Sequence, residues 1–264
     1  MAESRINANL GKAAGILVLL IFLFNSKLAA QNIDSTDVFT VSEALVDINQ
    51  DSIIDNLERT LKVAGRASSD NLVYNDRLLS LYMQDDKAGL QIYSGTLDAN
   101  IRKGDSLVVV GTLQLYYDKP EILVDTLHII DAEPKVPEPK PLKEVVGNPE
   151  EYLGMLVSGR ALISQKSASS GYRGLTISVE DTVDNILEVY VSQAHTFKDE
   201  FDFELLSIGD EVEITGVMGK FTFQNSGTTV YHVMPRTPDD IRNTGFPMRY
   251  FTYLMWIGLV TLIF

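Results

Sequence analysis

The chain has 264 residues, among them 22 Lys and Arg, 36 Asp and Glu and no Cys, and its formal net charge is −14. This length is enough for one large domain or for two small ones. The missing cysteines exclude disulfides, thiolate nucleophiles and cysteine-based metal sites. A negative field of this size repels polyphosphate at long range.

The N-terminus has the pattern of an export signal. Arg5 and Lys12 precede an apolar run at 13–24, and small residues then lead to Ala30. A charged start, a short apolar core and small residues at a cut site are typical of a secretory signal peptide. We therefore expect residues 1–30 to be a signal peptide and the protein to work outside the cytoplasm. The alternative is an uncleaved N-terminal anchor.

The C-terminus is apolar and uncharged from residue 250 onward, with Tyr250, Phe251, Tyr253 and Trp256 near the start of the run. Aromatic residues concentrate at membrane–water interfaces, and about 20 apolar residues span a bilayer. The run is shorter, so we expect an incomplete transmembrane helix at 249–264. The alternative is a hydrophobic helix that packs on the domain or lies on the bilayer.

Two stretches of the chain, about 100 residues apart, repeat one pattern. Each has a strand ending in Gly-Arg, a strand ending at an Asp turn, and a Gly-Asp turn before a strand that ends in Gly. The first copy has these features at Gly65, Asp85, Gly104 and Gly111, and the second at Gly159, Asp181, Gly209 and Gly216. A repeat of this length indicates a duplicated domain.

Each copy predicts five short strands. Runs of β-branched and apolar residues bounded by turn residues place the strands of the first copy at 60–68, 78–83, 89–93, 106–117 and 121–130. Five strands, with a glycine that lets the first and fourth bend, fit an OB-like barrel, and the alternative is another small β-sandwich. The predicted fold class is therefore mainly β, with two tandem OB-like five-stranded barrels joined by a Pro-rich linker.

The domain boundaries follow from these patterns. We expect a signal peptide at 1–30, a leader with an acidic loop at 31–57, a first OB-like domain at 58–131, a Pro-rich linker with a short helix at 132–152, a second OB-like domain at 153–241, and the membrane helix at 249–264. Four prolines lie within 134–141. They favour an extended and stiff spacer.

The turn residues also carry a resemblance. The segments 81–85 (Leu-Tyr-Met-Gln-Asp), 89–93 (Gly-Leu-Gln-Ile-Tyr) and 104–105 (Gly-Asp) resemble OB-fold units of exported bacterial proteins. The segment 238–241 (Pro-Asp-Asp-Ile), followed by an apolar run, is similar to the sensory part of membrane-bound receptor histidine kinases. The resemblance implies a single-pass protein of the bacterial inner membrane, with its OB-like domains in the periplasm, that acts as a homodimer. No kinase motif lies in these 264 residues.

Residues 47–58 have the ligand spacing of a calcium-binding loop. Oxygen-bearing side chains stand at its positions 1, 3, 5, 9 and 12, which are Asp47, Asn49, Asp51, Asp55 and Glu58. Such side chains converge because the chain winds around the ion. Position 6 is Ser52, where the sharp turn favours Gly, so the alternative is a solvated acidic loop with an Asx turn. If calcium binds, its role is structural.

The candidate ligand contacts lie in the first copy. OB barrels often bind ligands on the face made by strands two and three. The aromatic candidates are Tyr82, Tyr93, Tyr116 and Tyr117, and the charged candidates are Arg66 and Arg102. Aromatic residues interleaved with basic ones suit single-stranded nucleic acid, but the negative net charge makes nucleic acid an unexpected partner. The alternative is that most of these tyrosines are half-buried sheet residues.

The sequence has no Gly-x-Ser-x-Gly, His-Glu-x-x-His or phosphate-loop motif. Of its three histidines, His128 and His232 are expected at equivalent places in the last strands of the two copies. We therefore expect a non-catalytic module that senses a small-molecule or protein ligand for a membrane-bound signalling receptor. The alternatives are a membrane-tethered binding or adhesion module without signalling, and an exported nucleic-acid-binding protein.

Overall fold

The computed structural model describes residues 37–97, 99–130, 132–169, 172–179, 186–200, 203–223, 225–245, 250–251 and 254–255. The expected signal peptide and most of the expected membrane segment lie outside these ranges. Within the described ranges, no helix is both long enough and apolar enough to cross a bilayer.

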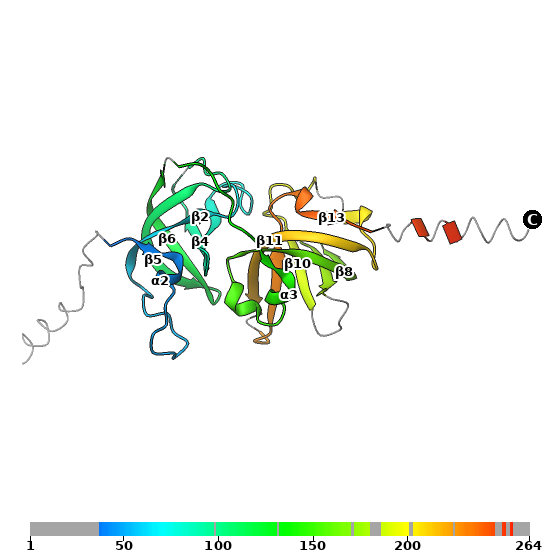
Figure 1. Ribbon diagram of the computed structural model, residues 1–264, viewed down its shortest axis with the longest axis horizontal. Coiled ribbons are helices and arrows are strands. Elements are labelled where there is room, and N and C mark those ends of the chain that lie inside the picture. The colour runs from blue at the N-terminus through cyan, green and yellow to red at the C-terminus, as the bar shows by residue number, and fades with distance from the viewer. Residues whose placement is uncertain are drawn as a thin grey trace, which may run out of the picture. The chain divides into compact units, whose positions relative to one another are not determined.

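The first sheet closes into a barrel, here called barrel 1 (Figure 1). Its strands are β2 (Thr60–Ala67), β3 (Leu79–Gln84), β4 (Gly89–Ser94), β5 (Ser106–Tyr116) and β6 (Lys119–Ile130). The first three form an antiparallel meander, β6 pairs in parallel with β4 and antiparallel with β5, and β5 closes the barrel on β2. This strand order makes barrel 1 an OB-like Greek-key barrel.

The second sheet, barrel 2, repeats this topology. Its strands are β8 (Leu156–Ser169), β9 (Tyr172–Ser178), β10 (Ile186–Ser192), β11 (Glu211–Thr222) and β12 (Thr229–Met234), with β13 (Ile241–Asn243) added beside β11. The parallel pairing of β10 with β12 and the closure of β11 on β8 match those of barrel 1. The prediction of two tandem OB-like barrels is confirmed, and the predicted strands of the first copy lie within two residues of the observed ones.

A short strand and a helical turn precede each barrel. They are β1 (Phe39–Thr40) with α2 (Val41–Ala44), and β7 (Lys140–Pro141) with α3 (Leu142–Val145). β1 pairs in parallel with β2, and β7 pairs in the same way with β8. Among the described residues, further short helices are η1 (Pro149–Tyr152), η3 (Phe203–Leu205) and η4 (Pro238–Asp240). The duplicated unit therefore begins earlier than the sequence repeat indicated.

The glycine of each first strand makes room for the helical turn. A Cβ on Gly65 would lie 3.0 Å from the side chain of Val41, and a Cβ on Gly159 would lie 2.9 Å from Leu142. Both helical residues are buried. The two glycines thus do more than bend the strand, because they let α2 and α3 pack against their barrels.

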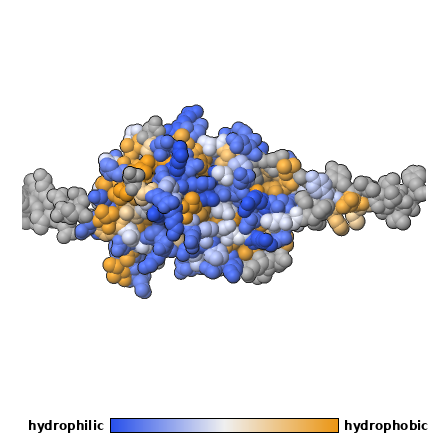
Figure 2. Space-filling view, turned by 45° about the horizontal axis from the view of Figure 1, so that its top comes forward, coloured by the Kyte–Doolittle hydropathy of each residue, from blue (hydrophilic) through white to orange (hydrophobic). Residues whose placement is uncertain are grey.

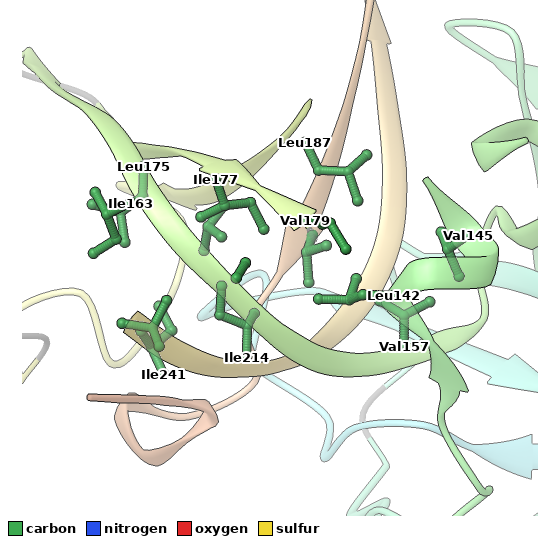
Figure 3. Close-up of a cluster of buried hydrophobic side chains, with 14 of the residues drawn as sticks. Leu142, Val145, Val157, Ile163, Leu175, Ile177, Val179, Leu187, Ile214 and Ile241 are labelled. Atoms are coloured by element: carbon green, nitrogen blue, oxygen red, sulfur yellow. The ribbon is translucent and has the colours of Figure 1, made fainter. Parts of the chain in front are cut away.

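Alternate residues of the strands fill each core, as expected for a sheet with one buried face. Figure 3 shows this for barrel 2, where Ile163, Leu175, Ile177 and Ile214 point into one cluster with Leu142 of α3. In barrel 1 the buried set includes Leu61, Val63, Leu81, Met83, Leu90, Ile92, Leu107, Val109, Leu113 and Ile122.

The Pro-rich linker is not a free spacer, because it lies against barrel 1. The N–H of Lys135 donates to the carbonyl of Gly104 at 2.9 Å, and Nζ of Lys140 donates to the carbonyl of Asp86 at 2.9 Å. Gly104 has a φ of 93°, and a Cβ there would lie 2.9 Å from the backbone of Lys135. Glycine is therefore required at this turn for its conformation and for the close approach of the linker.

Candidate binding surface at the junction of the two barrels

Barrel 2 covers the face of barrel 1 made by strands two and three. Tyr82 on β3 is only 5% exposed and packs against Leu156, Val217 and Met234 of barrel 2. OB barrels often bind their ligands on this face. In this protein the second barrel occupies this face, so Tyr82, which was predicted to contact a ligand, is buried as an inter-barrel packing residue.

Two glycines bring the two backbones together at this contact. Gly89 begins β4 in barrel 1, and Gly154 precedes β8 of barrel 2. A Cβ on either residue would overlap with backbone atoms of the other. Gly154 also has a φ of 75°, which favours glycine. No side chain fits at either position without shifting the barrels apart.

Buried polar groups add directed contacts. Oε1 of Gln84, a residue 3% exposed, accepts hydrogen bonds from the N–H of Leu156 at 2.6 Å and from the hydroxyl of Ser68 at 3.0 Å. Arg236 of barrel 2 donates to the carbonyl of Ser68 at 3.0 Å and holds Asp240 through two further bonds of 2.9 and 3.0 Å. Such a bidentate pair fixes the guanidinium in orientation.

Two buried histidines lie beside this contact. The ring of Tyr74 meets those of Tyr82 and His195 edge-on at 5.6 and 5.3 Å, and its hydroxyl donates to the carbonyl of Met234 at 3.4 Å. Burial lowers the pKa of His195 to about 4 and that of His232 to about 3. Both rings are therefore neutral at physiological pH.

The expected equivalence of His128 and His232 is wrong. His232 pairs with Gly219 near the end of β11, whereas His128 pairs with Val108 near the start of β5. The structural counterpart of His232 is Glu121, which lies opposite Gln114 near the end of β5. Spacing along the sequence misled the comparison because β6 is longer than β12.

The exposed side of the junction is a row of four aromatic rings, here called the aromatic ladder. Tyr116 and Tyr117 come from the β5–β6 hairpin, and Phe221 and Phe223 come from the β11–β12 hairpin. Successive ring centroids lie 4.7, 6.2 and 4.9 Å apart, in the order Tyr116, Tyr117, Phe221, Phe223. Each side chain is 43–50% exposed. Equivalent hairpins of the two barrels thus build one aromatic surface.

The structure brings together only part of the predicted contact set. Tyr93 is half-buried and lies near Tyr116. The pKa of Tyr116 is raised, first by the burial of its hydroxyl and then by the neighbouring Tyr117. Arg66 donates to the carbonyl of Gly104 at 3.1 Å, and Arg102 precedes the same turn.

Both arginines therefore lie at the Ser106 end of β5, and Tyr116 lies at the other end of that strand. Arg66 lines a separate cavity of about 770 Å³ between barrel 1 and the linker. Phe221 and Phe223 are outside the predicted set, because all its aromatic candidates lie in the first copy.

Charged groups of both signs surround the ladder. Lys119 is half-buried, and burial lowers its pKa. Glu121 is almost fully buried, accepts a hydrogen bond from Gln114 at 2.9 Å, and has its pKa raised by burial. Lys220 is paired with Glu150 at 2.7 Å. The ladder therefore lacks the excess of free cations that a polyanion would need.

A cavity of about 510 Å³, here called the junction groove, adjoins the ladder. Its walls come from three parts of the chain: the acidic loop with Ile53, the β5–β6 hairpin with Leu115 and Asp118, and barrel 2 with Glu151 and Lys220. A concave site lined mainly by apolar side chains, with a few polar groups, has the composition of a ligand pocket.

The acidic loop uses its carboxylates on its own backbone. Asp47 accepts hydrogen bonds from the N–H groups of Asp51 and Ser52 at 3.2 and 2.8 Å, and Asp55 accepts one from Ile48 at 2.9 Å. In the ranges that the structure covers, no three His, Asp or Glu side chains are gathered so that they could hold a metal ion. Asn49 and Asp51 each accept a hydrogen bond from the N–H two residues ahead, as in Asx turns. Calcium binding by Asp47, Asn49, Asp51, Asp55 and Glu58 stays a prediction.

No protein-family model and no curated protein matches the chain. Similar solved structures include an OBody bound to hen egg-white lysozyme (20% identity, 41% of this chain and 97% of that one, TM-score 0.32). Another is a murine DNA-binding protein bound to double-stranded DNA, with 11% identity over 70% of this chain and 97% of that one and a TM-score of 0.38. A third is fission yeast Pot1 with single-stranded DNA, with 10% identity over 70% of this chain and 83% of that one and a TM-score of 0.31. TM-scores this low carry no argument about ligands, and the OB-like assignment depends on the strand order.

The inter-barrel contact predicts that Gln84→Leu destabilises the protein. The substitution leaves the N–H of Leu156 and the hydroxyl of Ser68 without their buried acceptor, which costs about 1–3 kcal/mol. Urea unfolding measures the difference. The matched control is Gln165→Leu on an exposed position of β8, where the change should stay within about 0.5 kcal/mol. Equal effects of the two substitutions would contradict the bridging role of Gln84.

The buried histidines predict a loss of stability in acid. In the unfolded chain both imidazoles become protonated below the ordinary histidine pKa of 6.5. In the folded protein protonation occurs only near the lowered pKa values, about 4 for His195 and about 3 for His232. Stability is therefore full above pH 6.5 and falls below it, by up to about 1.4 kcal/mol per pH unit for each ring. His232→Gln should reduce this slope between pH 6 and 4 in urea unfolding. His128→Gln, at an exposed position, should leave it unchanged.

Proposed function

We propose that this chain is a non-catalytic extracytoplasmic binding module, the sensing part of a membrane-tethered bacterial receptor, and that a partner protein docks on the aromatic ladder. The observation that carries the docking site is the gathering of four half-exposed rings from equivalent hairpins of the two barrels. Contiguous exposed apolar clusters are typical of interaction sites, and buried aromatic anchors supply much of the binding energy at interfaces.

The surroundings of the ladder favour a polypeptide over other ligands. Aliphatic side chains continue the apolar surface, with Leu115 50% exposed and Ile53 57% exposed. Aliphatic groups gain from burial against other apolar side chains, which a protein partner supplies. Figure 2 shows one face of the molecule, on which apolar residues interrupt a mostly hydrophilic surface.

The proposed location and the proposed non-catalytic role are supported by the sequence. The signal-like segment 1–30 and the apolar segment 249–264 support a protein anchored at the membrane with its barrels outside the cytoplasm. The chain has no catalytic motif, which supports a binding role. The bacterial inner membrane and a signalling partner domain are part of the same proposal.

Single-stranded nucleic acid is the second candidate partner. Bases stack on exposed aromatic rings with little dependence on sequence, and the ladder offers four such rings. Against this candidate stand the net charge of −14 and the carboxylates of Glu121 and Glu150 near the ladder. An acidic protein gains little from counterion release, which drives most of the affinity for nucleic acids.

The ladder is tested with the double variant Tyr117→Ser and Phe221→Ser in the full chain. Peptides selected from a displayed random library against the wild-type protein should bind the variant at least about tenfold more weakly, because two aromatic anchors are lost. The control replaces two equally exposed apolar residues far from the hairpin tips, Leu205→Ser and Ile208→Ser, and should bind normally. Dissociation constants are measured by titration calorimetry.

Three outcomes would overturn the proposal of a protein partner at the ladder. Selected peptides could bind all three proteins equally, which removes the ladder from the site. A thymidine oligonucleotide could bind in a ladder-dependent manner with a steep loss of affinity in salt, which assigns the ladder to nucleic acid. Self-association of the wild-type chain that disappears in the ladder variant would assign it to a homodimer contact.

A further inference from the structure

The junction groove and the aromatic ladder share the same two hairpins. Leu115 and Asp118, which line the groove, directly flank the ladder pair Tyr116 and Tyr117. On the other hairpin Lys220 lines the groove and Phe221 belongs to the ladder. A polypeptide that covers the ladder therefore reaches the groove with its next residues.

The floor of the groove is apolar. Its aliphatic lining comes from Leu45, Ile53, Ile54, Leu57, Leu115 and Leu153. Two of these side chains remain accessible, since Ile53 is 57% exposed and Leu115 is 50% exposed. A volume of about 510 Å³ accommodates a few side chains rather than a whole domain. These features fit a short segment of a partner that inserts an aliphatic side chain.

The rim of the groove carries an excess of negative charge. Asp118, Glu150 and Glu151 line it, against the single ammonium of Lys220. Glu150 already holds this ammonium at 2.7 Å and also accepts a hydrogen bond from the hydroxyl of Tyr231 at 2.8 Å. Within the described residues, Asp118 and Glu151 have no ion-pair partner within 4.0 Å. Two carboxylates thus remain for a cation from outside.

We infer that the junction groove binds a short basic and apolar segment of the partner protein, with an aliphatic side chain on its floor and a Lys or Arg paired with Asp118 and Glu151. The inference rests on the proposed function, since the same partner covers the ladder. An acidic segment would add like charge to the rim, and a neutral one would leave both carboxylates desolvated without a partner.

The test uses three labelled six-residue peptides in which Leu alternates with Lys, Gln or Glu. Their affinity for the full chain is measured by fluorescence anisotropy at low and at high salt. The Lys peptide should bind at least about tenfold more tightly than the Gln peptide, and the Glu peptide should bind most weakly, because only Lys matches the rim charge. The advantage of the Lys peptide should shrink at high salt.

The double variant Asp118→Asn and Glu151→Gln removes the excess charge of the rim. It should bring the affinity for the Lys peptide down to that for the Gln peptide. Asp125→Asn with Glu133→Gln makes the same change in net charge at exposed positions outside the groove and should keep the preference for Lys. Ile53→Ser, at an exposed position on the floor of the groove, should weaken the binding of all three peptides without changing the order of their affinities.

The outcomes separate the groove from the ladder. If the remote charge variant loses the Lys preference as fully as the rim variant does, the net charge of the protein explains it and the inference is overturned. If the Gln peptide binds as tightly as the Lys peptide, the rim does not select a cation and the inference also fails. Loss of binding in the Tyr117→Ser and Phe221→Ser variant supports the proposed function in either case. A Lys preference that survives unchanged in that variant would confirm the groove and remove the ladder from the site.

Discussion

The arrangement of this protein depends on one close approach, between the backbones of Gly89 in barrel 1 and Gly154 in barrel 2. Neither position has space for a Cβ, so the two chains touch directly. The buried amide of Gln84 reinforces the contact by accepting the first N–H of β8, and Arg236 reaches across to Ser68. Because these contacts are short and directed, they set how the barrels are oriented and which of their surfaces meet.

The contact makes two copies of one fold unequal. It buries the face of barrel 1 on which OB barrels often hold ligands, and Tyr82 becomes a packing residue there. The same orientation places the hairpins between strands four and five of both barrels side by side, which builds the aromatic ladder. The aromatic ladder is therefore a surface that neither barrel forms alone, and ligand recognition there, as proposed, would require both barrels.

The sequence predicted the barrels well because their determinants are local. Strand patterns, the Gly-Asp turns and the bending glycines each depend on a few neighbouring residues. In the structure the strands and both Gly-Asp turns lie at the predicted positions. The burial of Tyr82 could not be predicted, because period-two alternation indicates which side chains share a face of a strand but not what covers that face. Of the ladder, the sequence predicted only Tyr116 and Tyr117. The contact of Tyr117 with Phe221 depends on how the barrels pack against each other, and this packing gives no periodic signal in the sequence.

The central claim is that the two barrels form one rigid unit that aligns the two hairpins. Because the chain has no cysteine, spin labels can be attached specifically at Asp118→Cys and Ser226→Cys, one on each hairpin. Pulsed electron spin resonance then measures the distance between them. We predict one narrow distance distribution in the otherwise wild-type chain and a broad one when Gly89→Val is added. A distribution that is already broad before that substitution would contradict the account.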